Sequence, residues 1–538
     1  MFDKSLYLFP LVLLAHPVIA MAGACERFVM DNGLTVLMQE EHSAPLLTMQ
    51  VWVKTGSVTE DEHMGAGISH FVEHMLFKGT EKRKVGEYAK EIASYGGRLN
   101  AYTTYKRTVY FFTIGSDYFD GGLDAISDVL LNANFPPEEA VKEQEVIRRE
   151  IAMFNDSPRS QLWQTMMATA YQSHPFRQPI IGHLSPYNSL TRDDLVNYYE
   201  KRYVPNNSIF VVVGDFNAKE ARAKIEKAFQ PWKRKALAPA YYPEEREQIA
   251  PRTREQSFNV QKTSCYLAWP SVSISSEDLF AMDILSIIAG HGKTSRLYRR
   301  LVEEEKLVED ISSTNWTPSD RGLFFVSMEL DYEKLDRAVE AVESEWERLK
   351  KERVSKEELE RAIATVVAKK VMNRETIEGI AHSIASGEIR LGDPSFDEQY
   401  EARIKEVDAD ELRRVARKYL IRQKRNKVVF KPKSKEEKVS AKVREEEAAK
   451  SSKESIPDVT QRSLPNGLNT LVLERPRLPL MTLALSFKAG SLFERGYPAG
   501  TAAFMAEMLA KGTKHRKAEE IAASLENVGG ELIIVSNK

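Results

Sequence analysis

The strongest constraint on the fold is that the chain begins to repeat itself. Residues 30–37 return as residues 464–471, with Asn32 matching Asn466, and residues 75–80 return as residues 508–513, with Met75 matching Met508. The offset is 434 (466 − 32) at the first match and 433 (508 − 75) at the second, so the second copy lacks one residue. Two further pairs of segments also match: 53–57 with 487–491, and 96–97 with 529–530. Such self-similarity predicts two copies of one structural unit, the second beginning near residue 462.

Length and periodicity divide the chain into several domains. At 538 residues the chain is too long to fold around a single hydrophobic core, because domains average about 150 residues. Strand-like and helix-like stretches alternate, which predicts α+β domains, each a mixed or antiparallel sheet covered by helices. We expect a signal peptide at 1–24, domains at 25–235 and 236–432, a charged linker at 433–460, and a truncated third repeat domain at 461–538. The linker is dense in Lys and Glu, and one long solvated helix is the alternative there.

The coarse secondary structure can be assigned from hydrophobic periodicity. Expected strands are 46–53, 108–114, 207–213, 264–269 and 322–330, and expected helices are 137–154, 192–203, 218–229 and 276–289. The strand 46–53 alternates apolar with polar residues, which predicts burial of one face only. Asn217 is the expected N-cap of the helix 218–229.

The N-terminus has the pattern of an export signal. A short charged start precedes the almost wholly apolar residues 6–20, and small residues follow at Ala22 and Ala24. The pattern predicts export to the bacterial periplasm, with a buried helix or retained anchor as the alternative. Cys25 follows the expected cleavage site, so lipid attachment there is a second, less favoured possibility. A disulfide between Cys25 and Cys265 stays open, but two cysteines cannot form a disulfide framework or a cysteine-ligated zinc site.

The overall charge argues against nucleic acid as a partner. The formal net charge is −2, so no basic field would draw the chain onto a phosphate backbone. No later stretch of the chain is apolar over about 18 residues, so the sequence predicts no membrane span in the mature protein.

One pentapeptide carries catalytic chemistry. His70-Phe71-Val72-Glu73-His74 lies in a helical stretch that we expect to end at Gly79. Histidines four residues apart project from one helix face, so both imidazoles can bind one zinc ion, while Glu73 can accept a proton from water. The order H-x-x-E-H is the inverse of the commoner H-E-x-x-H motif. The alternative is two ordinary histidines on an amphipathic helix.

A catalytic zinc needs a third protein ligand, and the expected helix 137–154 is rich in acidic residues. Glu143 and Glu150 are two turns apart and share a face, whereas Glu145 points elsewhere. The pattern alone does not choose among the candidates, which are Glu138, Glu139, Glu143, Glu145 and Glu150.

The motif, the repeat and the flanking residues resemble the pitrilysin/insulinase family of inverzincin peptidases, and most closely its branch of mitochondrial processing peptidases and bacterial relatives. The resemblance implies repeated domains of that type and one zinc ion per chain. It places the third ligand about 76 residues (150 − 74) after the second histidine, at Glu150. It also implies a supporting role for Glu143, which would orient a ligand imidazole.

The resemblance further implies an extended peptide or unfolded protein as substrate. In the family the segment that matches Asn100 and Ala101 pairs with the substrate backbone, which gives affinity without demanding one side chain. Without the resemblance, Asn100 is equally a loop residue that bonds its own backbone. The segment 290–297 resembles a second-domain motif of the family, and we interpret it as structural instead of as a phosphate loop.

The second copy lacks the metal-binding residues. At an offset of 433, Ala503, Ala506 and Glu507 stand opposite His70, Glu73 and His74. The sequence therefore predicts a zinc metalloendopeptidase with one active copy. The resemblance implies two halves that close over the substrate as a chamber, which a homodimer or a partner half would complete. The alternative is a non-catalytic or inactive subunit of a peptidase-like assembly.

Overall fold

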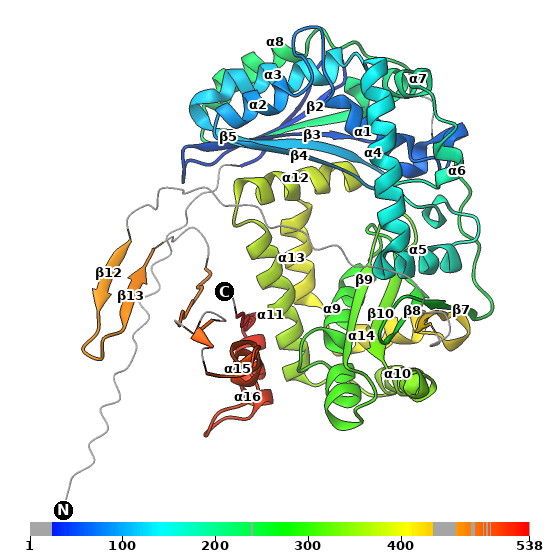
Figure 1. The fold of residues 1–538 in the computed structure, drawn as a ribbon, viewed down its shortest axis with the longest axis vertical. Helices are drawn as coiled ribbons and strands as arrows, with labels where there is room; N and C mark the ends of the chain where they lie inside the picture. The colour runs from blue at the N-terminus through cyan, green and yellow to red at the C-terminus, as the bar shows by residue number, and fades with distance from the viewer. Residues whose placement is uncertain are drawn as a thin grey trace, which may run out of the picture.

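The computed structural model describes residues 24–237, 240–433, 459–474, 479–487, 489–490, 493–494 and 496–536. The expected signal peptide (but for residue 24) and nearly all of the expected charged linker lie outside these residues. The described residues form two lobes, each built on one sheet, and a smaller C-terminal segment (Figure 1).

The first lobe is a six-stranded sheet in the order β1-β2-β6-β3-β5-β4. Only the pair β2–β6 is parallel. Its strands are β1 (Glu26–Val29), β2 (Thr35–Glu40), β3 (Leu46–Val53), β4 (Arg98–Thr103), β5 (Thr108–Gly115) and β6 (Ser208–Gly214). Its helices are α1 (Ile68–Leu76), α2 (Glu87–Ser94), α3 (Phe119–Asn132), α4 (Pro137–Asp156), α5 (Pro158–Ala170), α6 (Leu184–Tyr187), α7 (Arg192–Arg202) and α8 (Ala218–Phe229).

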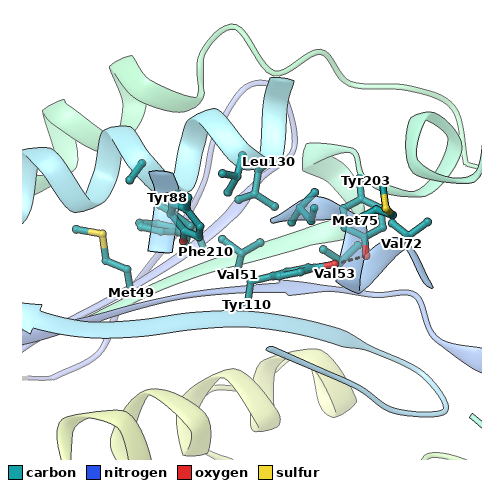
Figure 2. Close-up of a cluster of buried hydrophobic side chains, with 14 of the residues drawn as sticks. Met49, Val51, Val53, Val72, Met75, Tyr88, Tyr110, Leu130, Tyr203 and Phe210 are labelled. Carbon is teal, nitrogen blue, oxygen red and sulfur yellow. Dashed lines mark hydrogen bonds between the residues drawn. The ribbon is translucent and has the colours of Figure 1, made fainter. Parts of the chain in front are cut away.

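The main core of the first lobe fills the space between the sheet and the helices above it. Figure 2 shows Met49, Val51 and Phe210 on the face of the sheet that the helices cover, in the same cluster as Leu130 of α3. The hydroxyl of Tyr110 lies 2.7 Å from that of Tyr203, so these buried phenols satisfy each other. This packing fixes α1 over one end of the sheet, where α1 contacts β4, α4 and α7.

The prediction that β3 buries only one face is wrong. Seven of its eight residues are buried, as the pattern eBBBBBBB records from Leu46 to Val53. The helix α12 (Ile377–Leu391), which comes from the second half of the chain, covers the other face of the sheet (Figure 1). Ile380 and Ile384 of α12 pack there with Trp52. A sequence pattern for one strand cannot show that a helix more than 300 residues later covers it.

The second lobe is a five-stranded sheet in the order β7-β11-β8-β10-β9, with β7 and β11 parallel. Its strands are β7 (Arg252–Phe258), β8 (Thr263–Pro270), β9 (Asp310–Trp316), β10 (Leu323–Leu330) and β11 (Asn426–Pro432). Its helices are α9 (Leu279–Gly290), α10 (Leu335–Lys351), α11 (Lys356–Asn373), α12, α13 (Phe396–Glu406) and α14 (Ala409–Tyr419). The helix α5 of the first lobe packs on this sheet, with Leu162 and Met166 against Phe325 and Phe430.

Most expected elements lie within one or two residues of the observed ones. The strand 46–53 and the helix 218–229 match β3 and α8, and the Asn217 side chain accepts a hydrogen bond from the amide of Glu220 as the N-cap. The expectation that the metal-site helix ends at Gly79 is wrong, since α1 ends at Leu76. Gly79 instead has a φ of +118°, and the amide of the next residue, Thr80, donates a hydrogen bond to the carbonyl oxygen of Arg83.

The described residues of the second copy form counterparts of β1, β2, α1 and α2 in the same order. They are β12 (Thr460–Ser463), β13 (Asn469–Val472), α15 (Thr501–Leu509) and α16 (Ala518–Glu526). The antiparallel pair β12–β13 begins 434 residues (460 − 26) after β1, and α15 begins 433 residues (501 − 68) after α1. The structure of these segments therefore follows the sequence repeat.

The two copies differ in how far their apolar faces are covered. Phe71 and Met75 on α1 are buried, whereas their equivalents Phe504 and Met508 on α15 are 67% and 50% exposed. In the first copy α1 packs on β4, β5 and α7, and the described residues of the second copy contain no counterparts of β5 or α7.

Two other expectations can be compared with the structure. Cys25 and Cys265 are both free thiols, so the disulfide left open by the sequence is not present. Among the described residues, no helix combines the length and apolar character needed to cross a membrane.

Candidate metal centre

The helix α1 carries the H-x-x-E-H motif, and the buried Glu60 caps its start. Glu60 accepts hydrogen bonds from the amides of Gly67 (3.1 Å) and Ser69 (3.0 Å). Gly67 is the N-cap with a φ of +73°, and a Cβ there would lie 2.3 Å from the carbonyl oxygen of Ile181. This position therefore needs glycine both for its conformation and for close packing. Glu60 satisfies amides at the first turn that would otherwise have no partner.

Three possible ligand atoms converge beside α1. The Nε2 atoms of His70 and His74 are 3.3 Å apart. Glu150 comes from α4, which packs alongside α1, and its Oε2 lies 3.8 Å from Nε2 of His70 and 3.6 Å from Nε2 of His74. These three side chains form the one group of the described residues whose geometry suits a metal ion. Sequence spacing predicted the two histidines, and the family resemblance supplied Glu150.

Glu143 lies behind His74, where the resemblance predicted a supporting residue. Its Oε2 is 3.0 Å from Nδ1 of His74, and Lys78 contacts its other oxygen. Burial acts to raise the pKa of Glu143, but the hydrogen bonds and charges of His74 and Lys78 lower it to about 2. An ionised Glu143 accepts a hydrogen bond from Nδ1–H, so in the neutral His74 ring the lone pair lies on Nε2, toward His70 and Glu150.

His70 is held in the neutral form that a metal ligand requires. Burial, together with the charge of His74, lowers the pKa of His70 to about 3. Its Nδ1 is buried without a hydrogen-bond partner in the described structure, so its Nε2 is the atom directed at the cluster. Burial also acts to lower the pKa of His74, but the hydrogen bond that its Nδ1–H donates to Glu143 and the charges of Glu150 and Glu73 outweigh burial and raise that pKa.

Glu73 lies next to the cluster and is bound to a residue that the sequence did not single out. The Thr103 hydroxyl donates to Oε2 of Glu73 at 2.5 Å. Burial raises the pKa of Glu73, although this hydrogen bond opposes the shift. Thr103 lies two residues after Ala101 on β4 and so shares its face of the strand, but no period of helix or strand relates Thr103 to Glu73.

The residues expected to bind substrate lie on an edge strand. β4 pairs with β5 on one side, with Asn100 opposite Phe111 and Ala101 opposite Tyr110, and pairs with no other described strand. The side-chain oxygen of Asn100 accepts a hydrogen bond from the amide of Ala101 at 2.9 Å. Asn100 therefore bonds the amide of the next residue, but it lies on a strand and not in the loop that the alternative assumed. The other edge of that strand pairs with no described strand.

The donor set fits zinc. Two imidazole nitrogens and one carboxylate oxygen are the ligand types that catalytic zinc sites use, and three protein ligands leave a position for water or substrate. The other acidic candidates of α4 do not join the cluster, since Glu139 pairs with Lys142 and Glu145 pairs with Arg148. On the second copy, α15 has Ala503, Ala506 and Glu507 at the motif positions and contributes to no metal-binding group.

Two family descriptions match the chain. One, the insulinase family or peptidase family M16, matches residues 35–183 and 470–537. The other, the peptidase M16 inactive domain, matches residues 189–366. The insulinase family description matches in two places. Residues 35–183 include the H-x-x-E-H motif and Glu150, and residues 470–537 lie in the second copy.

Relatives in several organisms are similar over most of the chain. An uncharacterized zinc protease of Rickettsia felis is 28% identical over 72% of this chain and 93% of its own length. The zinc protease PqqE of Helicobacter pylori is 28% identical over 76% of this chain and 93% of its own length. A probable mitochondrial-processing peptidase subunit beta of Arabidopsis thaliana is 28% identical, covering 76% and 78%.

Solved structures share the fold. The crystal structure of a protease from Helicobacter pylori superposes with a TM-score of 0.71 at 26% identity, and covers 76% of this chain and 100% of that one. A peptidase M16 inactive domain from Pseudomonas fluorescens gives a TM-score of 0.70 at 19% identity, covering 76% and 98%, which is a likeness of fold alone.

Proposed function

Because this chain belongs to the insulinase (M16) peptidase family, we propose that it is a zinc metalloendopeptidase that hydrolyses unfolded peptides or small proteins. The observation that carries the proposal is the convergence of His70, His74 and Glu150 beside the buried Glu73. A family relationship alone would not suffice, because the family includes inactive domains.

His70, His74 and Glu150 would hold one zinc ion per chain. When bound, zinc would polarise the scissile carbonyl and make a water molecule more acidic near neutral pH. Glu143 would keep the His74 ring in the required tautomer and orientation through the 3.0 Å contact at Nδ1.

Glu73 would act as the general base. Its carboxylate would accept a proton from the attacking water at one oxygen, and pass that proton to the leaving amine. The other oxygen, Oε2, is held by the Thr103 hydroxyl, which limits the orientations open to the carboxylate.

The edge of β4 would bind the substrate backbone. An extended peptide added beside Asn100 and Ala101 would become the next strand of the first sheet, and α1 lies against that strand. Backbone pairing would give affinity with little demand on side chains.

The test is cleavage of a quenched unfolded peptide by the wild type and by Glu73→Gln, with zinc content measured on both. We expect Glu73→Gln to retain about one zinc per chain and to lose at least about 100-fold in rate, the scale of a general-base contribution. Glu62→Gln, an exposed glutamate nearby, should behave as wild type. Cleavage by Glu73→Gln at the wild-type rate would exclude Glu73 as the base.

A second candidate function is that of a non-catalytic subunit. The match of residues 189–366 to an inactive domain, and the second copy without metal ligands, favour it. A protein that binds zinc but cleaves no peptide, alone or mixed with a partner half, would support this candidate.

The proposal also covers location and assembly. Residues 1–24 would direct export to the periplasm; the less favoured alternative is lipid attachment at Cys25, which would hold the chain at a membrane surface. Cell fractionation and the mass of the mature N-terminus distinguish these outcomes.

A homodimer or a partner half would complete the chamber, which the mass of the assembly in solution would report.

A further inference from the structure

The loop after α9 binds a carboxylate that belongs to the second copy. The two oxygens of Glu526, the last residue of α16, accept hydrogen bonds from the amides of Lys293 (3.0 Å) and Thr294 (3.2 Å). The Thr294 hydroxyl donates to the same carboxylate. We propose that residues 291–295, which we call the carboxylate seat, are the docking site of the second copy on the second lobe, and that Glu526 is its anchor.

The seat has the shape that such an anchor requires. Gly292 has a φ of +80°, and a Cβ there would lie 2.8 Å from Oε1 of Glu526. Successive amides that converge on one carboxylate form charge-assisted hydrogen bonds, which are stronger than neutral ones. The segment was interpreted from the sequence as structural, and this contact gives it a specific role in holding another part of the chain.

A second, independent contact lies on the same side of the molecule. A Cβ at Gly529 would lie 2.5 Å from Cβ of Ala368 and 2.8 Å from the carbonyl oxygen of Ala364, both on α11. The turn after α16 therefore approaches α11 as closely as backbone allows. Figure 1 shows α16 beside α11. Burial lowers the pKa of Lys369 on α11, and the charge of Glu531 partly opposes that shift.

Comparison of the two copies separates docking from folding. At an offset of 433, the equivalent of Gly529 is Gly96, and that of Glu526 is Ala93, which is exposed on α2. Gly96 has the same left-handed conformation, but nothing lies within 4 Å of the position of its Cβ. The repeated unit thus folds without a carboxylate at this position and without the close approach. Both features occur only where the copy contacts the second lobe.

The contact includes a repulsive pair, which supplies a control. Glu303 of the second lobe and Glu519 of α16 interact across it: burial raises the pKa of Glu303, and the charge of Glu519 and a hydrogen bond between the two carboxyl groups raise it further. Removal of the Glu519 charge should therefore favour docking, whereas removal of the Glu526 charge should oppose it. The two residues lie on the same helix, so Glu→Gln at each is a matched chemical change.

The experiment is hydrogen–deuterium exchange on the full chain, read at the amides of Lys293 and Thr294. We expect these amides to exchange about tenfold faster or more in Glu526→Gln, because buried or bound amides exchange only when their contacts open. Glu519→Gln should exchange at the wild-type rate or more slowly. Ala368→Leu, which blocks Gly529 without touching the seat, should also accelerate exchange at these amides.

Two results would overturn the assignment. One is equal exchange at Lys293 and Thr294 in the wild type, Glu526→Gln and Ala368→Leu. The other is faster exchange that extends to β10 in both variants, which would mean that the substitutions loosen the whole second lobe instead of releasing the second copy.

Discussion

Glu143 Oε2 lies 3.0 Å from Nδ1 of His74, on the side of the imidazole opposite the converging ligand atoms. One carboxylate on α4 thus orients a ring on α1, and a second carboxylate two turns later, Glu150, reaches the same cluster. The two helices are coupled through His74 from both sides.

Loss of this contact should weaken zinc binding without removing a ligand. We expect Glu143→Ala to lower zinc affinity by about 10- to 100-fold, because the His74 ring would lose its tautomer and orientation. Glu145→Ala on the exposed side of α4 is the control. Competition titration against a chelator measures both, and equal affinities would argue against an orienting role for Glu143.

Removal of a ligand itself should have a larger effect. His74→Ala leaves two donors, too few for a catalytic zinc site, so we expect purified protein to contain far less than one zinc per chain. Elemental analysis of wild type and variant measures this. Wild-type protein without zinc, after purification in zinc-containing buffer, would contradict the proposed centre.

The buried cap of α1 should contribute to stability in a manner independent of metal. Glu60→Gln replaces one acceptor oxygen with an amide nitrogen that faces a backbone N–H, so we expect a loss of about 1–3 kcal/mol. Thermal unfolding of the chelator-treated protein measures this, with the exposed Glu62→Gln as control. Equal midpoints for the two variants would refute the cap's contribution.

Asp278 should make stability depend on acid pH. Burial acts to raise its pKa, but hydrogen bonds from Lys418, Tyr419 and Arg414 lower it from 3.8 to about 2. A carboxyl whose folded pKa is depressed stabilises the fold above its unfolded pKa, and that contribution is lost as pH falls from about 4 to about 2.

After allowance for solvent screening we expect about 1 kcal/mol from Asp278 at neutral pH. The measurement is urea unfolding of wild type and Asp278→Asn between pH 2 and 6, the interval that brackets the titration. The difference in free energy of unfolding should grow with pH through this range, and a difference independent of pH would contradict the assignment.

Cys265 should resist thiol reagents until the second lobe unfolds. It is completely buried, and burial raises the pKa of its thiol to about 12, so almost no thiolate exists at neutral pH. We expect labelling by a maleimide only in denaturant, followed by peptide mass spectrometry. Rapid labelling of Cys265 in the native protein would show that β8 opens without global unfolding.

The sequence predicted the elements whose signal is local. The helix 218–229 and its Asn217 cap needed only periodicity and a capping residue, and both agree with the structure. The histidine pair needed only helical spacing. Glu150 could not be selected in this way, since five glutamates on one helix differ only in which of them faces α1, and the family resemblance made the choice.

A local sequence pattern could not predict the features that depend on contacts between distant segments. The burial of both faces of β3 comes from α12, and the hydroxyl on Glu73 comes from Thr103 on another element. In each case the contact joins residues too far apart in the sequence for the period of a helix or a strand to relate them.

The cap of α1 recurs in the second copy. Glu494 accepts hydrogen bonds from the amides of Gly500 (3.1 Å) and Ala502 (2.7 Å) at the start of α15, as Glu60 does for Gly67 and Ser69. Because α15 has no metal-binding residues, this cap belongs to the architecture of the repeat and not to the chemistry of the first copy. For this reason the substitution Glu60→Gln is expected to lower the stability of the protein whether or not zinc is bound.

The helix α4, which carries Glu143 and Glu150, runs directly through Ser157 into α5, and α5 packs on the sheet of the second lobe. At 20 residues α4 is a rod of about 30 Å. A rotation of one lobe against the other must therefore either bend the chain at Ser157 or carry the Glu150 carboxylate away from the two imidazoles. If the chain does not bend at Ser157, the distances between the three ligand atoms therefore change with the angle between the two lobes.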